Sequence, residues 1–209
     1  MLFQTIDINA TTKVYLWKIT ESFDELFRAV KLRDVSLARL EKMKSEEHQK
    51  GFLAVRMILQ HLNLDDLSLF YDESGKPHLK ECPYKEISIS HSNEFSAIAI
   101  SDKKIGLDLE KIKPKVLKIA PRFMDVSHLE NLSEQEKVVK ATVVWGIKES
   151  VFKVKNEKGI SFPDHIFESK FSLLDKKTTA QLHFNNAKET FDIVFNNVED
   201  YIFVCAFPV

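Results

Sequence analysis

Two acidic residues placed one apart in an otherwise apolar segment have the type and spacing of a metal-binding pair. Asp108 and Glu110 alternate with leucines. In a strand, residues i and i+2 point to the same face, roughly 6.5 Å apart along the chain. Two carboxylates this close repel each other unless a cation neutralises them. Because Mg²⁺ takes oxygen ligands, usually one or two carboxylates plus waters and substrate phosphates, this pair predicts a Mg²⁺ site.

A second group of charged residues lies in the segment 145–153, for which the sequence predicts a long helix. Positions three and four apart share a helix face. One continuous stripe is therefore expected to carry Trp145, Lys148, Glu149, Phe152 and Lys153. A solvated face would not carry the aromatic residues, and a core face would not carry the Lys–Glu pair. An ordinary amphipathic helix with an i,i+4 Glu149–Lys153 pair nevertheless explains this stripe as well as a functional site does.

Taken together, the two segments resemble the motifs of a known family. G-x-D-x-E, followed about forty residues later by W-x-x-K-E-S-x-x-K, resembles the 4'-phosphopantetheinyl transferase superfamily, and the chain is similar to its longer, surfactin-synthetase-like type. Ser74-Gly75-Lys76-Pro77 resembles the G-K-P stretch of that family, and the segment 87–92 resembles its S-H-S stretch. Four motifs in the family's order are a specific signal, whereas any one alone would be weak.

The resemblance implies an enzyme that transfers the 4'-phosphopantetheine arm of coenzyme A to a serine of an apo acyl or peptidyl carrier protein, releasing 3',5'-ADP, with Mg²⁺ as cofactor. Positioning and charge neutralisation dominate such phosphoryl transfer. Asp108, Glu110 and Glu149 are the expected metal ligands, and Asp108, Glu149 and Lys153 the expected catalytic residues. Glu149 is expected to be a ligand first and a base for the serine proton second, because metal ligation lowers its basicity. Fatty-acid, polyketide and peptide-synthetase carriers remain open.

The resemblance also implies which residues bind coenzyme A. Arg56 falls in an A-x-R-x-(I/L) match on a helix that starts near Ser45, and His91 corresponds to the residue that meets the 3'-phosphate. The full expected set is Arg56, Gly75, Lys76, Pro77, Ser90, His91, Lys148 and Lys153. Judged from residue type alone, a surface arginine, an ordinary polar turn and a hydrogen-bonded turn histidine are the commoner explanations. The chain departs from many members in having only Gly159 in the loop after the last motif lysine.

The implied fold is α+β, with two similar halves, each containing an antiparallel sheet and a long helix. These halves, 1–104 on the coenzyme A nucleotide side and 105–209 on the metal and catalytic side, are expected to be related by a pseudo-twofold with the active site in the cleft between them. Ser45-Glu46-Glu47 and the capping box of residues 133–136 are predicted to start the two long helices, a weak sign of internal duplication.

The remaining elements follow from hydrophobic periodicity and turn residues. A helical region is expected over 23–40, and strands over 14–19, 67–71, 87–90, 95–101, 179–184, 190–195 and 201–207. The last three strands form an antiparallel meander, with turns expected at 185–188 and 196–197. The basic run from Lys111 to Arg122 is either a solvated surface or a face for an acidic carrier protein.

Composition places the chain among ordinary globular proteins. Its 209 residues are 44% hydrophobic and 29% charged, with a net charge of −1, so no broad basic field favours nucleic acid or an anionic membrane as partner. Cys82 and Cys205 lack metal-ligand spacing, which favours a reduced, cytoplasmic setting. Residues 1–13 lack the apolar core of a signal peptide, and no stretch approaches the roughly 20 apolar residues of a membrane helix. A monomer is expected.

Two other functions use the same residues. A Mg²⁺-dependent phosphodiesterase or nuclease also needs a D-x-E pair with a later Glu and Lys, but the net charge of −1 and the lack of a basic stripe argue against it. A non-catalytic coenzyme A-binding relic of a transferase is the other alternative, and the presence of all three carboxylates and Lys153 argues against that. DNA cleavage would favour the nuclease, and coenzyme A binding without transfer would favour the relic.

Overall fold

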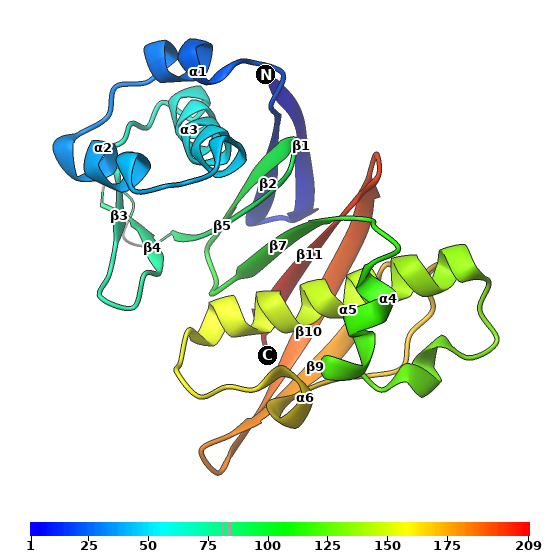
Figure 1. The fold of residues 1–209 in the computed structure, drawn as a ribbon. Coiled ribbons are helices and arrows are strands. Elements are labelled where there is room, and N and C mark those ends of the chain that lie inside the picture. The colour runs from blue at the N-terminus through cyan, green and yellow to red at the C-terminus, as the bar shows by residue number, and fades with distance from the viewer. Residues whose placement is uncertain (81, 83–84) are drawn as a thin grey trace. The chain divides into compact units, whose positions relative to one another are not determined.

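The chain forms two compact units, residues 1–103 and 104–209, in a computed structural model that describes residues 1–80, 82 and 85–209 (Figure 1). Each unit combines helices with an antiparallel sheet. The expected α+β class with antiparallel sheets is therefore confirmed. In the described part of the chain, no helix combines the length and the apolar character needed to cross a membrane.

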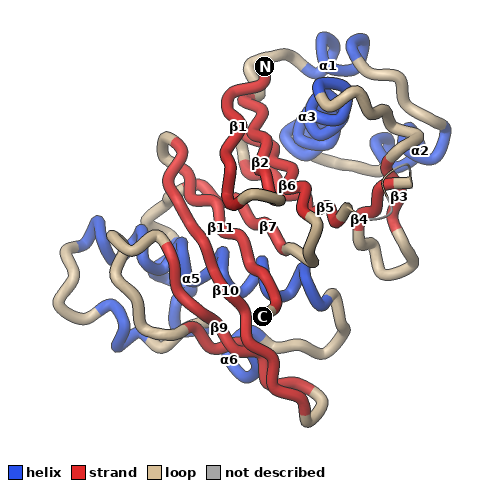
Figure 2. The backbone as a smooth tube through the Cα atoms, turned by 180° about the vertical axis from the view of Figure 1, so that it is seen from behind, coloured by secondary structure: helices blue, strands red, loops and turns tan. Residues whose placement is uncertain are grey.

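The described residues of the first unit form a four-stranded antiparallel sheet, three helices and a short hairpin. Its sheet has the order β1-β2-β6-β5, and β3 pairs only with β4 among the described strands (Figure 2). The elements are β1 (Leu2–Asn9), β2 (Thr12–Lys18), α1 (Phe23–Ala29), α2 (Asp34–Glu41), α3 (Glu46–His61), β3 (Leu69–Tyr71), β4 (Pro77–Leu79), β5 (Glu86–Ser92) and β6 (Phe95–Ser101).

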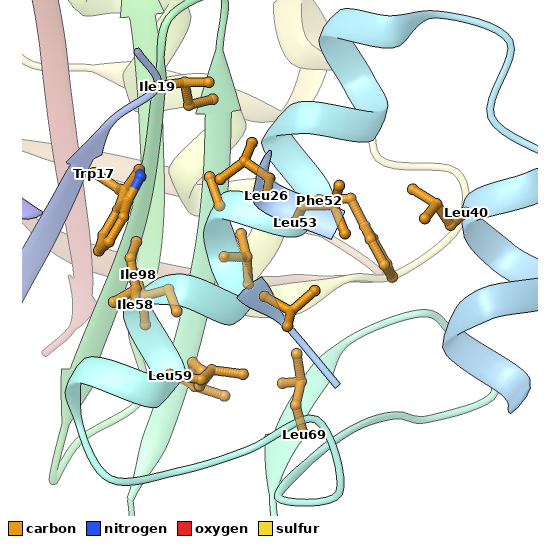
Figure 3. Packing of buried hydrophobic residues seen from close by; sticks show 14 of the residues in the cluster. Trp17, Ile19, Leu26, Leu40, Phe52, Leu53, Ile58, Leu59, Leu69 and Ile98 are labelled. Carbon is orange, nitrogen blue, oxygen red and sulfur yellow. The ribbon is translucent and has the colours of Figure 1, made fainter. Parts of the chain in front are cut away.

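Helix α3 is the centre of the core of this unit. Its apolar side chains Leu53, Ile58 and Leu59 are fully buried and belong to one cluster with Trp17 of β2 and Ile98 of β6 (Figure 3). Full burial of one such aliphatic side chain stabilises a fold by roughly 1.5–3 kcal/mol. This packing holds α3 against the sheet, and it fixes which residues of the helix remain outside the core.

Two expectations for the first unit were incomplete. The helical region expected over 23–40 is two helices, because Val30 and Arg33 adopt extended conformations between α1 and α2. The Arg33 backbone N–H donates to Asp66 Oδ2 at 3.0 Å, which stabilises this break by a contact 33 residues away along the chain. Strand β1 was not predicted, since most of its side chains are exposed and apolar alternation is weak.

The second unit is a five-stranded antiparallel sheet with the order β7-β11-β10-β9-β8. One long helix, α5, packs against this sheet (Figures 1 and 2). Its Val143, Ile147 and Val151 belong to the buried cluster of this unit. The elements are β7 (Gly106–Lys111), α4 (Val116–Ile119), the 3-10 helices η1 (Ala120–Arg122) and η2 (Val126–Leu129), α5 (Glu134–Lys155), α6 (Phe162–His165), β8 (Ile166–Glu168), β9 (Lys177–Phe184), β10 (Ala187–Val198) and β11 (Tyr201–Pro208).

The ends of α5 follow local sequence signals. The predicted capping box is confirmed, because Ser133 Oγ accepts from the Glu136 N–H at 3.4 Å and Glu136 Oε2 accepts from the Ser133 N–H at 2.9 Å. At the other end Asn156 adopts the left-handed conformation with φ 51°. Asparagine tolerates this conformation better than most residues, so it can end the helix at a position where glycine is common.

The expected meander of β9, β10 and β11 is confirmed, but one of its turns lies elsewhere. Asn185 and Asn186, with φ 51° and 60°, form the turn between β9 and β10 as predicted. The turn expected at 196–197 was wrong, because these two asparagines lie within β10 and pair with β11. The chain reverses at Glu199, whose φ is 49°, and Asp200.

Candidate active site on β7 and α5

Two glycines bring α5 into direct backbone contact with the sheet of the second unit. A Cβ atom at Gly106 of β7 would lie 1.9 Å from the carbonyl oxygen of Ser150, and a Cβ atom at Gly146 of α5 would lie 2.5 Å from Val204 Cγ2. The Ser150 hydroxyl donates to the carbonyl oxygens of Gly146 at 2.6 Å and Val204 at 3.0 Å. The small residues of both motifs therefore set the distance between helix and sheet.

The charged residues of the two motifs meet at this contact. Asp108 of β7 is only 4% exposed, and its Oδ1 accepts from Lys153 Nζ at 2.8 Å. The same ammonium donates to the Leu107 carbonyl oxygen at 2.9 Å. Trp145 Nε1 donates to Glu110 Oε1 at 3.3 Å. Asp108 and Glu110 of β7 thus meet Lys153 and Trp145 of α5.

Electrostatic coupling shows that Glu149 belongs to this group. Burial, reinforced by the nearby charge of Asp108, raises the pKa of Glu110 to about 7, and the charge of Glu149 acts in the same direction. Burial and then Asp108 also raise the pKa of Glu149, while Lys153 opposes the shift. Three carboxylates therefore share the ammonium of Lys153, and the site carries excess negative charge.

The donor chemistry of this group fits a hard divalent cation. Asp108, Glu110 and Glu149 offer carboxylate oxygens, which are the ligands Mg²⁺ prefers, and their mutual repulsion would be relieved by a cation. Within the described residues, however, no three acidic, imidazole or thiol groups are already arranged as a metal-binding cluster. In this structure the ammonium of Lys153 balances Asp108.

Lys148 does not share the face of Glu149, which corrects the single stripe expected for this helix. Its side chain is buried and its Nζ donates to Glu168 Oε2 at 2.7 Å and to the Ile166 carbonyl oxygen of β8. Consecutive residues point about 100° apart around a helix. Lys148 is therefore bonded to β8, and its expected role in coenzyme A binding stays a prediction. Glu168 was not identified from the sequence, where no spacing connects it to Lys148.

The two aromatic residues of the stripe pack against other rings. Trp145 lies edge-on to Phe123 at 5.1 Å and to Phe162 at 5.5 Å, and Phe152 lies 6.0 Å from Phe162. Offset and edge-to-face ring pairs of this kind stabilise a contact by about 0.5–1.5 kcal/mol each. Trp145 of α5 thus packs against two phenylalanine rings outside its helix and also donates a hydrogen bond to the Glu110 carboxylate.

Comparison with known proteins adds a separate observation to this geometry. Over 151 residues the chain is 30% identical to 4'-phosphopantetheinyl transferase ffp of Bacillus subtilis, a match that covers 68% of this chain and 67% of that protein. The chain belongs to the 4'-phosphopantetheinyl transferase family. The family resemblance identified from the four motifs is therefore confirmed.

Other relatives of this family match over different shares of their length. Identity is 31% over 128 residues to transferase Sfp of Bacillus subtilis (strain 168), covering 57% of each chain, and 33% over 100 residues to a second transferase of Bacillus subtilis, covering 46% of this chain and 44% of that protein. The chain thus spans about half the length of these two relatives. Transferase psf-1 of Bacillus pumilus is 27% identical over 172 residues, or 79% of this chain and 70% of its own. No protein-family model matches the chain.

In the first unit, Arg56 is buried and paired with Asp66. It is 2% exposed, its Nε donates to Asp66 Oδ1 at 2.9 Å, and its Nη1 donates to the Phe52 carbonyl oxygen at 3.2 Å. Its guanidinium also lies 3.5 Å from the centre of the Phe52 ring. These contacts hold the Arg56 guanidinium inside the first unit, and its binding of coenzyme A stays a prediction.

The expected coenzyme A residues 75–77 lie in the hairpin between β3 and β4. Asp72 organises this turn, since its Oδ1 accepts from the backbone N–H groups of Ser74 and Lys76, each at 2.9 Å. Gly75 has φ 84°, a conformation that favours glycine, and Pro77 begins β4. Lys76 Nζ lies 3.8 Å from Glu86 Oε2, a weak ion pair that leaves it able to take another partner.

His91 and Ser90 lie on β5, where the sequence placed them. The His91 side chain is exposed, and its ring covers Gly51 of α3, where an added Cβ would lie 2.8 Å from His91 Cδ2. The ring of His48, also on α3, stands edge-on to His91 at 5.5 Å. Ser90 is buried. Thus His91 is the more accessible of the two, while Gly51 allows its ring to lie directly on the helix.

Proposed function

We propose that this protein transfers the 4'-phosphopantetheine arm of coenzyme A to a serine of an apo acyl or peptidyl carrier protein. The serine hydroxyl forms a bond to the β-phosphorus of coenzyme A, the bond from that phosphorus to the bridging oxygen breaks, and 3',5'-ADP leaves with that oxygen. One observation supports this most strongly: in a member of this family, Asp108, Glu110, Glu149 and Lys153 form one partly buried, charged group.

Each residue of this group has a separate role in the proposal. Asp108, Glu110 and Glu149 would hold a Mg²⁺ ion, which supplies charge neutralisation at the pyrophosphate. Lys153 is close enough to Asp108 to place its ammonium beside the same phosphates. Glu149, whose pKa is raised by burial, would accept the serine proton in addition to acting as a ligand. Positioning and electrostatic stabilisation are sufficient for this type of transfer.

The proposed activity is tested by the mass of carrier proteins. Apo carriers of the fatty-acid, polyketide and peptide-synthetase types are incubated with the protein, coenzyme A and Mg²⁺. The mass of each carrier is then measured for the gain of one phosphopantetheine group. At least one carrier should be modified, and its Ser→Ala variant should not. Coenzyme A binding with no modified carrier would favour the non-catalytic relic, and cleavage of added DNA would favour the nuclease.

The proposal includes a common plan for the two units. In each unit, the strand that comes before the helices pairs antiparallel with the last strand of that unit. These pairs are β2 with β6 and β7 with β11. Each long helix begins at a Glu that follows a Ser N-cap, although of the two only Ser133 makes the capping hydrogen bond. These features support two related halves.

We further propose that His91 binds the 3'-phosphate of coenzyme A, because its imidazole is exposed and an N–H of the ring donates well to a phosphate oxygen. One charge-assisted hydrogen bond is worth roughly 1.5–3 kcal/mol. His91→Ala should therefore weaken coenzyme A binding about ten- to a hundredfold. Binding of dephospho-coenzyme A, which lacks this phosphate, should change little.

Calorimetric titration of both ligands makes this comparison, with His61→Ala as the matched control, because His61 is an exposed histidine at the end of α3. The control should bind both ligands as the unmodified protein does. Equal losses for both ligands in His91→Ala would show that His91 is a structural residue that covers Gly51.

A further inference from the structure

We propose that Glu168 is a positioning residue for the transfer reaction: acting through Lys148, it sets the rotation of α5 and so holds Glu149 and Lys153 against Asp108. Glu168 lies on β8, where its carboxylate contacts Lys148 and His128. Its effect would reach the site through the helix. The kinetic part of this inference rests on the proposed function, whereas its structural part does not.

The first step is the anchor itself. The Lys148 ammonium donates both to the Glu168 carboxylate, at 2.7 Å, and to the backbone carbonyl of Ile166. The Lys148 side chain is 3% exposed and that of Glu168 is 4% exposed. Two bonds from one ammonium to a single short strand fix the direction in which this side chain leaves the helix.

The second step is the rest of the helix contact. The close approaches at Gly106 and Gly146 set the distance between α5 and the sheet. The Ser150 hydroxyl, which donates to the Val204 carbonyl oxygen at 3.0 Å, is one directional contact between α5 and the sheet, and the van der Waals packing around it is compatible with small rotations because dispersion has little directional preference. The Lys148 anchor is directional, and Glu149 is the next residue along the chain. A rotation that breaks the anchor would therefore also move Glu149 and Lys153 relative to β7.

The third step is the support of the Glu168 carboxylate. Its second oxygen, Oε1, lies 3.2 Å from Nδ1 of His128, a residue of the 3-10 helix η2. Lys140, eight residues before Lys148 on α5, interacts electrostatically with Glu168, and its ammonium donates to the Phe171 carbonyl oxygen. The carboxylate is thus held from η2 as well as from α5, so it is a fixed point and not a mobile surface charge.

A stabilising role alone would not need charges here. Replacing a buried ion pair with apolar residues of similar volume often leaves stability unchanged or improves it. The apolar pair would lack the directional hydrogen bond that joins residues 148 and 168. This difference separates a positioning role from a purely structural one, since the double variant Lys148→Met/Glu168→Leu should restore packing without restoring direction.

The experiment compares this double variant with a matched control on the same helix. The control, Lys137→Met/Glu134→Leu, removes an exposed ion pair whose atoms lie 2.6 Å apart. Three properties are measured: the denaturant midpoint, the indole N–H resonance of Trp145 in a nitrogen-15 spectrum, and kcat and KM for coenzyme A. Trp145 reports on the site because its indole donates to Glu110, and Trp17, in the first unit, is the internal reference.

We expect the double variant to fold with an unchanged or higher midpoint, while the Trp145 resonance shifts and that of Trp17 does not. Removing partners that orient ligand residues typically costs about ten- to a hundredfold in activity. We expect a loss of kcat in this range with KM for coenzyme A unchanged, and no change in the control. Glu168→Gln, whose amide oxygen still accepts from Lys148, should show the same changes at smaller size.

A folded double variant with the original Trp145 resonance and the original kcat would overturn the proposal and leave the pair a structural one. If the double variant does not fold, Glu168→Gln decides by the same two readouts. If no carrier is modified by the unaltered protein, the proposed function fails, and the Trp145 resonance alone then decides whether Glu168 positions α5.

Discussion

Asp108→Asn and Glu149→Gln are each expected to reduce carrier modification about a hundredfold or more, while the fold remains intact. Each change keeps the shape of the side chain and removes one of the carboxylates proposed to hold Mg²⁺. A bound metal ion contributes several kcal/mol of charge stabilisation in the transition state, and each 1.4 kcal/mol corresponds to a factor of ten in rate. The measurement is the rate of carrier modification across a Mg²⁺ titration, and Mn²⁺ should replace Mg²⁺ because it also suits oxygen ligands.

The two variants should differ in stability. Glu149→Gln removes one of three mutually repelling carboxylates, so its free energy of unfolding should stay the same or rise. Asp108→Asn removes the partner of Lys153, whose side chain is 28% exposed and remains solvated, so the loss should be small. Asp192→Asn, at an exposed position on β10, is the control for both properties. A near-normal rate at low Mg²⁺ in either site variant would show that the metal assignment is wrong.

Gly106→Ala is expected to destabilise the second unit by about 3 kcal/mol or more, at or beyond the upper end of ordinary overpacking. The added methyl group would meet the Ser150 carbonyl oxygen at 1.9 Å, and a backbone atom cannot turn away as a flexible side chain would. Either α5 moves off the sheet or the chain unfolds. Urea denaturation followed by circular dichroism measures the loss, and any folded fraction should also be a poor transferase because the helix has moved.

Gly75→Ala is the matched control for this change. Gly75 has a positive φ of 84°, unlike Gly106, but an added Cβ would meet no atom within 4 Å among the described residues. Only the conformational cost of about 1–2 kcal/mol for an L residue in this region should appear. If Gly106→Ala were no more destabilising than Gly75→Ala, α5 would not be in the close contact that positions Glu149 and Lys153.

Features that depend on neighbouring residues followed from the sequence by itself. The alternation around Asp108 and Glu110 predicted a strand, the Ser133–Glu136 box predicted the start of α5, and Asn185-Asn186 predicted a turn, because strand alternation, helix capping and positive φ are all decided within a few residues. Four motifs in order also indicated the family, which the comparisons confirm.

The break between α1 and α2, the burial of Arg56 and the direction of Lys148 were decided only by the tertiary structure. Asp66 receives the backbone N–H of Arg33 and the guanidinium of Arg56. Spacing along α5 placed Lys148 and Glu149 on one stripe, yet Glu168 draws the lysine to β8. Residue spacing defines the faces of a helix relative to one another, but the rotation of those faces against a sheet depends on contacts from distant residues. In this protein those contacts are the close approaches at Gly106 of β7 and Gly146 of α5, together with the ion pair between Lys148 and Glu168.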